Sequence, residues 1–219
     1  MADLEAGTLT DGQTPDYLVL LQEVVESRPT DVTTLARAKG LSSFFVPVLY
    51  QGEVMRGNAI LSTKQLVDSR PIALPQERQP RTAVAAAIEV AGQRLFVVSA
   101  HLENRVSWYR GGLFSDNARG RQADVLLRAL PSDQPGILGG DLNTWLGRNE
   151  PAWRAFDRRF ADTPAELLSP TFRFRLVLDH LLFDLPAGWQ ASRRVLPDRY
   201  GSDHHPVMGV IRQSYTAIQ

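Results

Sequence analysis

The sequence predicts an α/β (α+β) fold in which two packed β-sheets are flanked by helices. Three observations support this class. Short apolar runs of strand length alternate with a few helical segments, two of these runs are joined by a hairpin signal, and no linker rich in Pro, Gly or Ser divides the chain. A length of 219 residues suits one sizeable domain, so we expect a single domain over residues 1–219.

The first half of the chain is dominated by strand patterns. Thr30-Asp31 can cap a short helix that runs through Ala38 and ends at Gly40. A second signal, Ala91-Gly92 between two apolar runs, predicts a hairpin turn. The strands expected here are Tyr17–Leu21, Phe44–Leu49, Ala59–Leu61, Thr82–Val90 and Arg94–Ala100.

The second half contains the two longer helices. Apolar residues at helical spacing predict a helix over Ala118–Leu130, which Pro131 ends, and another helix runs from Asn149 or Glu150 to about Phe160. The remaining strands expected are Gly136–Gly139, Leu176–Phe183 and Pro206–Ile211. Short strands and hairpins in this proportion favour two packed sheets over a doubly wound parallel sheet.

Composition excludes several classes of protein. Lys+Arg and Asp+Glu are equal at 24 each, so the net charge gives no general attraction to nucleic acid, although it does not exclude such a substrate. The chain has no cysteine, which rules out disulfides and thiolate metal sites. No stretch approaches the roughly 20 apolar residues of a membrane span. The acidic segment Met1–Asp16 lacks the features of a signal peptide, so we expect a cytoplasmic protein on this start site.

Polar side chains recur where the expected strands end. A carboxylate or imidazole follows each of several apolar runs, and Asp141 and Asn143 stand two apart, so that on extended backbone they point the same way. These residues are Glu23, His101, Asp141, Asn143 and Asp179, and two more, Asp203 and His204, precede the last expected strand. Carboxylate and amide oxygens are hard ligands that suit Mg²⁺, or alternatively Mn²⁺. A histidine backed by a carboxylate has a fixed tautomer, and Asp179 with His204 is the expected pair.

Each motif alone also has a structural explanation. A strand-end Glu is more often solvated than a ligand, and Asp-x-Asn after two glycines is commonly a turn. A lone histidine is more often a hydrogen-bonded structural residue. Ser202-Asp203-His204-His205-Pro206 is the most specific segment, because a turn does not require two adjacent histidines. The histidine spacing matches none of the helical zinc motifs.

Taken in order, these segments resemble the endonuclease/exonuclease/phosphatase superfamily, which includes apurinic endonucleases, deoxyribonuclease I and sphingomyelinases. The resemblance covers nearly the whole chain. Its motifs are Leu21-Gln22-Glu23, Arg56–Ser62, Ser99–Glu103, Arg121-Gln122-Ala123, Gly139–Asn143, Pro170-Thr171-Phe172, Leu178-Asp179-His180 and Ser202–Pro206. It implies a four-layer α/β/β/α sandwich of two mixed sheets, and Mg²⁺-dependent hydrolysis of a phosphoester.

The resemblance also implies roles for single residues. Glu23 would be the main metal ligand and Asp203 would lie near the metal. Asp141 would activate or orient water and Asn143 would hold the phosphate. His204, oriented by Asp179, would contact the scissile phosphate or exchange a proton, and His101 would stabilise developing charge. The choice of general base between Asp141 and His204 stays open.

The chain departs from the family pattern at its start. The family opens with a strand that carries an active-site asparagine, placed before the segment that ends in Gln-Glu. Met1–Thr14 contains neither an asparagine nor an apolar strand, so we expect the first family strand to be missing. An unpaired edge on the neighbouring strand would follow.

The substrate class remains open between a nucleic acid and a small or lipid phosphoester. The segment after His101 contains Arg105, Trp108 and Tyr109, which could stack on bases and meet phosphates, or could simply cover an edge of the core. Trp145 and Asn58 are further tentative substrate contacts. A third hypothesis is a catalytically impaired phosphate- or nucleic-acid-binding module that retains the fold. The sequence does not determine the oligomeric state.

Overall fold

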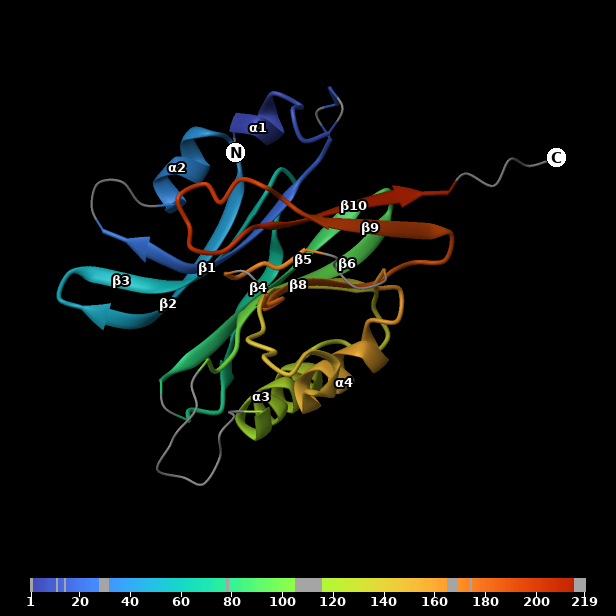
Figure 1. Cartoon of the computed structure of the whole chain (residues 1–219). Coiled ribbons are helices and arrows are strands. Elements are labelled where there is room, and N and C mark those ends of the chain that lie inside the picture. The colour runs from blue at the N-terminus through green and yellow to red at the C-terminus, as the bar shows by residue number, and fades with distance from the viewer. Residues whose placement is uncertain are drawn as a thin grey trace.

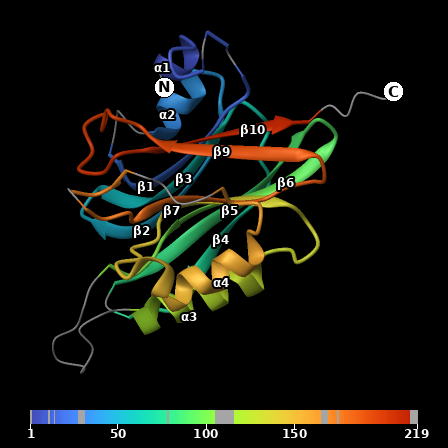
Figure 2. The ribbon, with the colours of Figure 1, turned by 45° about the vertical axis from the view of Figure 1, so that its right-hand side comes forward.

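The computed structural model describes residues 2–10, 12–13, 15–27, 32–77, 79–104, 116–164, 169–173 and 175–214. Two β-layers pack face to face (Figures 1 and 2). The short helices α1 (Ala2–Glu5) and α2 (Val32–Ala38) lie outside one layer, and α3 (Asp116–Ala129) and α4 (Pro151–Arg159) lie outside the other. This is the four-layer α/β/β/α sandwich that the resemblance implied.

The first layer is a five-stranded mixed sheet in the order β4-β5-β6-β7-β8. The neighbouring strands β6 and β7 are parallel and are connected through α3, whereas the other pairs are antiparallel. The hairpin expected at Ala91-Gly92 joins β5 to β6, and both turn residues have positive φ, as a tight hairpin turn requires. The bounds are β4 Val67–Leu74, β5 Arg81–Val90, β6 Gln93–His101, β7 Gly136–Asp141 and β8 Asp179–Asp184.

The second layer consists of two antiparallel pieces. One is a three-stranded sheet in the order β1-β3-β2, and the other pairs β10 with β9. All pairings described in this layer are antiparallel, so only the five-stranded sheet is mixed among the described strands. The bounds are β1 Leu18–Glu26, β2 Ser42–Gln51, β3 Val54–Ser62, β9 Trp189–Val195 and β10 Val207–Gln213.

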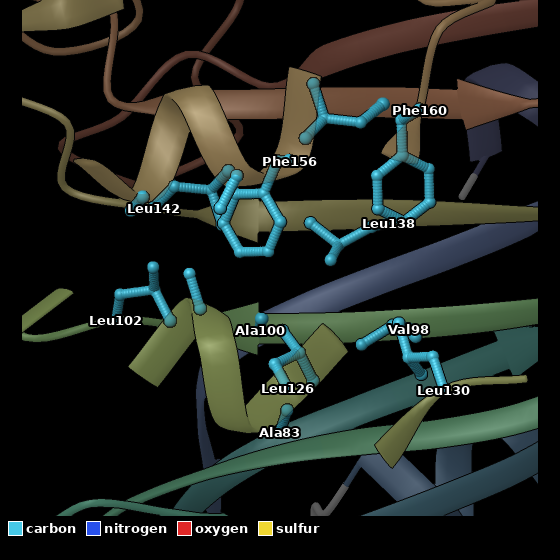
Figure 3. Packing of buried hydrophobic residues seen from close by; sticks show 14 of the residues in the cluster. Ala83, Val98, Ala100, Leu102, Leu126, Leu130, Leu138, Leu142, Phe156 and Phe160 are labelled. Carbon is cyan, nitrogen blue, oxygen red and sulfur yellow. The ribbon is translucent and has the colours of Figure 1, made fainter. Parts of the chain in front are cut away.

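Successive side chains along a strand point to opposite faces of the sheet, so the buried apolar residues form separate layers. On β5, Val84 and Ile88 point between the sheets, while Ala83 and Ala85 point towards α3 and α4. Figure 3 shows the helix side, where leucine and phenylalanine side chains of α3 and α4 pack on β6 and β7. A third, smaller cluster packs α2 on β1 and β3. Three apolar layers therefore hold the four layers of backbone together.

The expected elements differ from the observed ones in several places. The strand expected over Leu176–Phe183 begins only at Asp179, because the backbone N–H groups of Leu178 and Asp179 donate to the Thr171 hydroxyl and Leu176 pairs with Phe172 instead. The prediction that Leu176–Leu178 is strand is therefore wrong. The helix α1 and the strands β4 and β9 were not expected from the sequence.

The strands β1 and β10 are edges within the described part of the chain. Each pairs on one side only, and both line a cavity of about 710 Å³. Apolar side chains such as Leu20 and Val210 line the cavity, which extends to Asp179 and His204. No strand precedes β1 in the described residues.

A buried ion pair ties the helices to the loops that carry polar residues. Arg119 of α3 and Glu150, at the start of α4, are 1 % and 0 % exposed at their side chains. The guanidinium donates to both Glu150 carboxylate oxygens, at 3.2 and 2.6 Å, and to the carbonyl of Glu103 at 3.2 Å. Glu150 also accepts from the Leu146 backbone N–H. The pair therefore fixes the segments that follow His101 and Asn143.

Among the described helices, none combines the length and the apolar character needed to cross a bilayer.

Candidate active site

Strand register brings the predicted residues together at one end of the sandwich. His101 lies opposite Asp141 in the parallel pair β6/β7, and Asp141 lies opposite Asp179 in the antiparallel pair β7/β8. The Ser99 hydroxyl donates to the Leu21 carbonyl at 2.9 Å and accepts from the Gln22 side chain at 2.9 Å, which ties β1 to β6 across the two layers. Residues from four strands therefore meet at one rim.

His101 stands between two carboxylates. Its Nδ1 is 3.7 Å from Glu23 Oε1, and its Nε2 is 3.5 Å from Asp141 Oδ2. Burial first, then the positive charges of Arg81 and His204, lower the pKa of His101 well below its usual value. The imidazole is therefore neutral, and the two contacts are not ion pairs. Glu23 occupies the β1 bulge with a positive φ of 54°, and its side chain is 61 % exposed, so its carboxylate remains open to a ligand.

The Asp141–Asn143 turn is held by its own hydrogen bonds. The Asn143 N–H donates to Asp141 Oδ1 at 3.0 Å, and the Asn143 side-chain amide donates to the Leu102 carbonyl at 3.2 Å. Gly140 permits the close approach of β6 and β7 just before this turn, because a Cβ there would lie 1.8 Å from the Ala100 carbonyl oxygen. Gly140 is therefore needed to seat Asp141 beside His101.

Asp179 and His204 form the expected pair. His204 Nδ1 donates to Asp179 Oδ2 at 2.7 Å, which leaves Nε2 for a ligand. The Phe172 ring packs on the imidazole with centroids 4.5 Å apart, and the Thr171 hydroxyl accepts from the Asp179 N–H. The segment Pro170-Thr171-Phe172 therefore positions both members of the pair.

The site favours the neutral form of Asp141 and the charged form of His204. Burial, together with the negative charge of Asp179, raises the pKa of Asp141 to about 7. Burial alone would lower the pKa of His204, but its hydrogen bond to Asp179 and the charges of Asp179, Asp141 and Asp203 outweigh this and raise it. The arrangement favours a cationic His204 beside a carboxyl group that can take up a proton near neutral pH.

Arg81 is the functional candidate that the sequence analysis missed. It begins β5, is 8 % exposed, and its Nε and Nη2 have no hydrogen-bond partner in the described part of the chain. Burial lowers its pKa, while the charges of Glu103, Asp141 and Glu23 raise it. A buried guanidinium with free donors beside these acids suits a phosphate group. An arginine at the start of a strand gives no sequence signal of its own.

The other predicted residues are placed less centrally. Asp203 is exposed beside His204. Asn58 is buried, and its amide donates to the Thr82 carbonyl at 2.7 Å, next to Arg81, so it helps to hold β5. Trp145 is 42 % exposed just beyond Asn143. Arg105, Trp108 and Tyr109 lie outside the described residues.

The carboxylate and amide oxygens of the site suit a hard cation, although they do not already surround a single point. Within the described ranges, no group of three or more His, Asp or Glu side chains is already arranged around one point as metal ligands. Mg²⁺ usually keeps several waters and binds through one or two carboxylates plus substrate phosphate. The exposed carboxylate of Glu23, which lies across His101 from the buried acid Asp141, fits that pattern.

Acid is expected to destabilise the fold through His180, which lies on the helix side of β8 against Trp153. Burial, then the charge of Arg193, lowers its pKa to about 3. Below pH 6.5 His180 of the unfolded chain binds a proton, whereas His180 of the folded chain does so only near pH 3. The free energy of unfolding therefore falls as the pH is lowered from 6.5 to about 3. Between pH 7 and pH 5 this residue should account for a loss of about 2 kcal/mol.

Urea unfolding of the wild type and of His180→Phe at these two pH values measures this contribution. The loss on acidification should be smaller in the variant by about that amount. Equal losses in both proteins would show that His180 does not carry the effect.

A family sequence model and several solved structures match most of this chain. Residues 6–204 match the sequence model of the Endonuclease/Exonuclease/phosphatase family. Comparison with curated proteins gives no match. An endonuclease/exonuclease/phosphatase from Beutenbergia cavernae DSM 12333 is structurally similar, with a TM-score of 0.70, 20 % identity, and coverage of 97 % of this chain and 66 % of that one.

Two further solved structures share the fold. The human Nocturnin catalytic domain with bound sulfate has a TM-score of 0.67 and 19 % identity, and the alignment covers 96 % of this chain and 85 % of that one. A Staphylococcus aureus beta toxin mutant with bound magnesium ions has a TM-score of 0.64 and 18 % identity, with 95 % and 90 % covered. At these identities the likeness concerns the fold.

Proposed function

This chain belongs to the endonuclease/exonuclease/phosphatase family, whose members hydrolyse phosphoesters, and from this premise we propose that it is a Mg²⁺-dependent phosphoester hydrolase. The observation that carries the proposal is the juxtaposition of Asp141, the Asp179–His204 pair and buried Arg81 at one rim. An acid that can accept a proton lies beside cationic donors, as attack of water on a phosphoester requires.

Glu23 and Asp203 are the side chains that would hold the metal ion, Mg²⁺ or alternatively Mn²⁺. Glu23 supports this assignment best, because its carboxylate is open to solvent and lies 3.7 Å from His101. A bound divalent cation would supply charge neutralisation at the phosphate and at the leaving oxygen.

The protein's own groups divide the remaining work. Asp141 is proposed to take the proton from the attacking water, because its buried carboxyl has a raised pKa. His204 is held by Asp179 through Nδ1, so its Nε2–H can donate to a phosphate oxygen. The electrostatics therefore favour Asp141 over His204 as the base.

Three further groups are proposed to bind the phosphate and its developing charge. Asn143 keeps one amide hydrogen beyond its bond to Leu102, and Arg81 keeps two buried nitrogens without partners. His101, neutral and buried, presents Nε2 beside Asp141. Donors fixed in a buried site stabilise charge more strongly than donors in water, because they need no reorganisation.

Turnover of bis(p-nitrophenyl) phosphate in Mg²⁺ tests the proposal, and p-nitrophenyl phosphate under the same conditions separates a phosphodiesterase from a phosphatase. Cleavage of plasmid or of abasic duplex would identify a nuclease. A folded chain that turns over none of these and still binds phosphate or nucleic acid would instead be the binding module that has lost activity.

A further inference from the structure

Glu23 lies on a stretch of β1 where regular alternation would point its side chain away from the candidate active site. Before it, Leu20 contacts the apolar layer between the sheets, whereas Val19 and Leu21 contact the layer under α2. Successive side chains of a strand point to opposite faces, so position 23 of a regular strand would share the face of Val19 and Leu21. Its carboxylate would then lie towards α2 and not towards His101.

A bulge in β1 turns Glu23 to the other face. The register of β1 on β3 slips by one residue here, so that Gln22 and Glu23 together lie opposite Asn58. Such a bulge adds one residue to a strand and reverses the faces of the side chains that follow. Glu23 has a positive φ of 54°, and its Oε1 lies 3.7 Å from Nδ1 of His101. The bulge therefore directs the carboxylate of Glu23 towards His101.

The end of β1 shows the same change of phase. Glu26 lies an odd number of positions after Leu21, and on a regular strand two such residues face opposite sides. Leu21 nevertheless packs in the apolar cluster under α2, and the Glu26 carboxylate accepts from the backbone N–H of Thr33 in α2 at 3.3 Å. Both residues therefore face α2, as the extra residue between them requires.

Two hydrogen bonds between the sheets hold this bulge. The Gln22 side-chain amide donates to the Ser99 hydroxyl at 2.9 Å, and that hydroxyl donates to the Leu21 carbonyl at 2.9 Å. Ser99 is fully buried on β6, two residues before His101, so both side chains lie on the same face of that strand. A non-glycine residue with positive φ is strained, and such strain persists only where surrounding contacts fix it. These bonds are contacts of that kind.

We propose that Gln22 and Ser99 are positioning residues for the divalent cation and act through Glu23. By holding the bulge they keep the Glu23 carboxylate turned towards Nδ1 of His101. Groups that hold a metal ligand in place without touching the metal change its affinity by about ten- to a hundredfold when they are removed. The assignment of the cation rests on the proposed function, whereas the orientation of Glu23 by the bulge does not.

Binding of Mn²⁺ to the full chain, followed by the electron paramagnetic resonance signal of the free ion, tests the proposal without any substrate. Ser99→Ala and Gln22→Met should each weaken the affinity for Mn²⁺ about tenfold. Glu23→Gln removes the ligand itself and should weaken the affinity at least as much. When Ser99→Ala is added to Glu23→Gln, no further loss of affinity is expected, because the hydroxyl acts only through Glu23.

Ser62→Ala is the matched control for a purely structural effect. Ser62 is also buried, and its hydroxyl accepts from the backbone N–H of Lys64 at 2.9 Å, beside Leu18 at the start of β1. Ser62→Ala and Ser99→Ala should both lower the melting temperature, but Ser62→Ala should leave the affinity for Mn²⁺ unchanged. An equal loss of affinity in the two serine variants would contradict the proposal.

The remaining outcomes separate the positioning role from the hydrolase itself. Wild-type affinity for Mn²⁺ in both Ser99→Ala and Gln22→Met would overturn the proposal, and so would a further loss of about tenfold when Ser99→Ala is added to Glu23→Gln. A wild type that binds no Mn²⁺, or an unchanged affinity in Glu23→Gln, would remove the cation from Glu23 and the proposal with it. Weakened binding in Ser99→Ala together with absence of all turnover would reject the proposed hydrolase and leave the positioning role standing.

Discussion

Asp141→Asn is expected to lower kcat for bis(p-nitrophenyl) phosphate by about a thousandfold, because the amide cannot accept the proton of the attacking water. The amide oxygen can still accept the bond from the Asn143 N–H, so the turn should keep its shape. The same substitution should not destabilise the fold. Burial raises the pKa of Asp141 to about 7, so its ionised form opposes folding near neutral pH, and a neutral isostere removes that opposition.

Initial rates and thermal unfolding of the same preparation separate the two effects. Asp133→Asn, an exposed acid just before β7 and therefore at the opposite end of that strand from Asp141, is the matched control and should change neither. Full activity of Asp141→Asn would remove Asp141 from the chemistry. A large fall in melting temperature would mean that the lost rate reflects lost structure.

His204→Gln is expected to lower kcat by about a hundredfold or more, because it removes the cationic donor that faces the phosphate. Asp179→Asn should lower kcat less, since it weakens the charge and orientation of His204 without deleting the ring. The double variant should be no slower than His204→Gln alone, because the two residues act as one unit.

The adjacent histidine is the control for this pair. His205 uses both ring nitrogens within the protein, since Nδ1 donates to the Leu196 carbonyl at 3.0 Å and Nε2 accepts from Arg199 at 2.9 Å. His205→Gln should therefore lower stability and leave kcat close to the wild-type value. Equal losses of kcat in the two histidine variants, or strictly multiplicative effects of Asp179 and His204, would contradict the proposed division of roles.

Much of the fold follows from local sequence patterns. Continuous apolar runs are found on strands buried on both faces, and the Ala91-Gly92 turn is found where the hairpin was expected. The strand β4 was not predicted, because Pro71 interrupts its pattern. Its position at the edge of the sheet tolerates that proline. The strand β9 alternates Trp189, Ala191 and Val195 with polar residues, a pattern that could have identified it.

Part of the site could also be predicted, because its residues lie near the ends of apolar strands. His101 and Asp141 end apolar strands and Asp179 begins one, and parallel and antiparallel register then brings these three residues into one row. Arg81 could not be found in this way, because its importance comes from burial beside acids that are distant in sequence.

Metal dependence distinguishes a hydrolase of this kind from a phosphate-binding module most directly. Turnover of bis(p-nitrophenyl) phosphate should vanish in EDTA, return on addition of excess Mg²⁺, and require a higher Mg²⁺ concentration in Glu23→Gln than in Glu53→Gln, an exposed control. Equal activity of the wild type with and without EDTA would contradict the proposed mechanism.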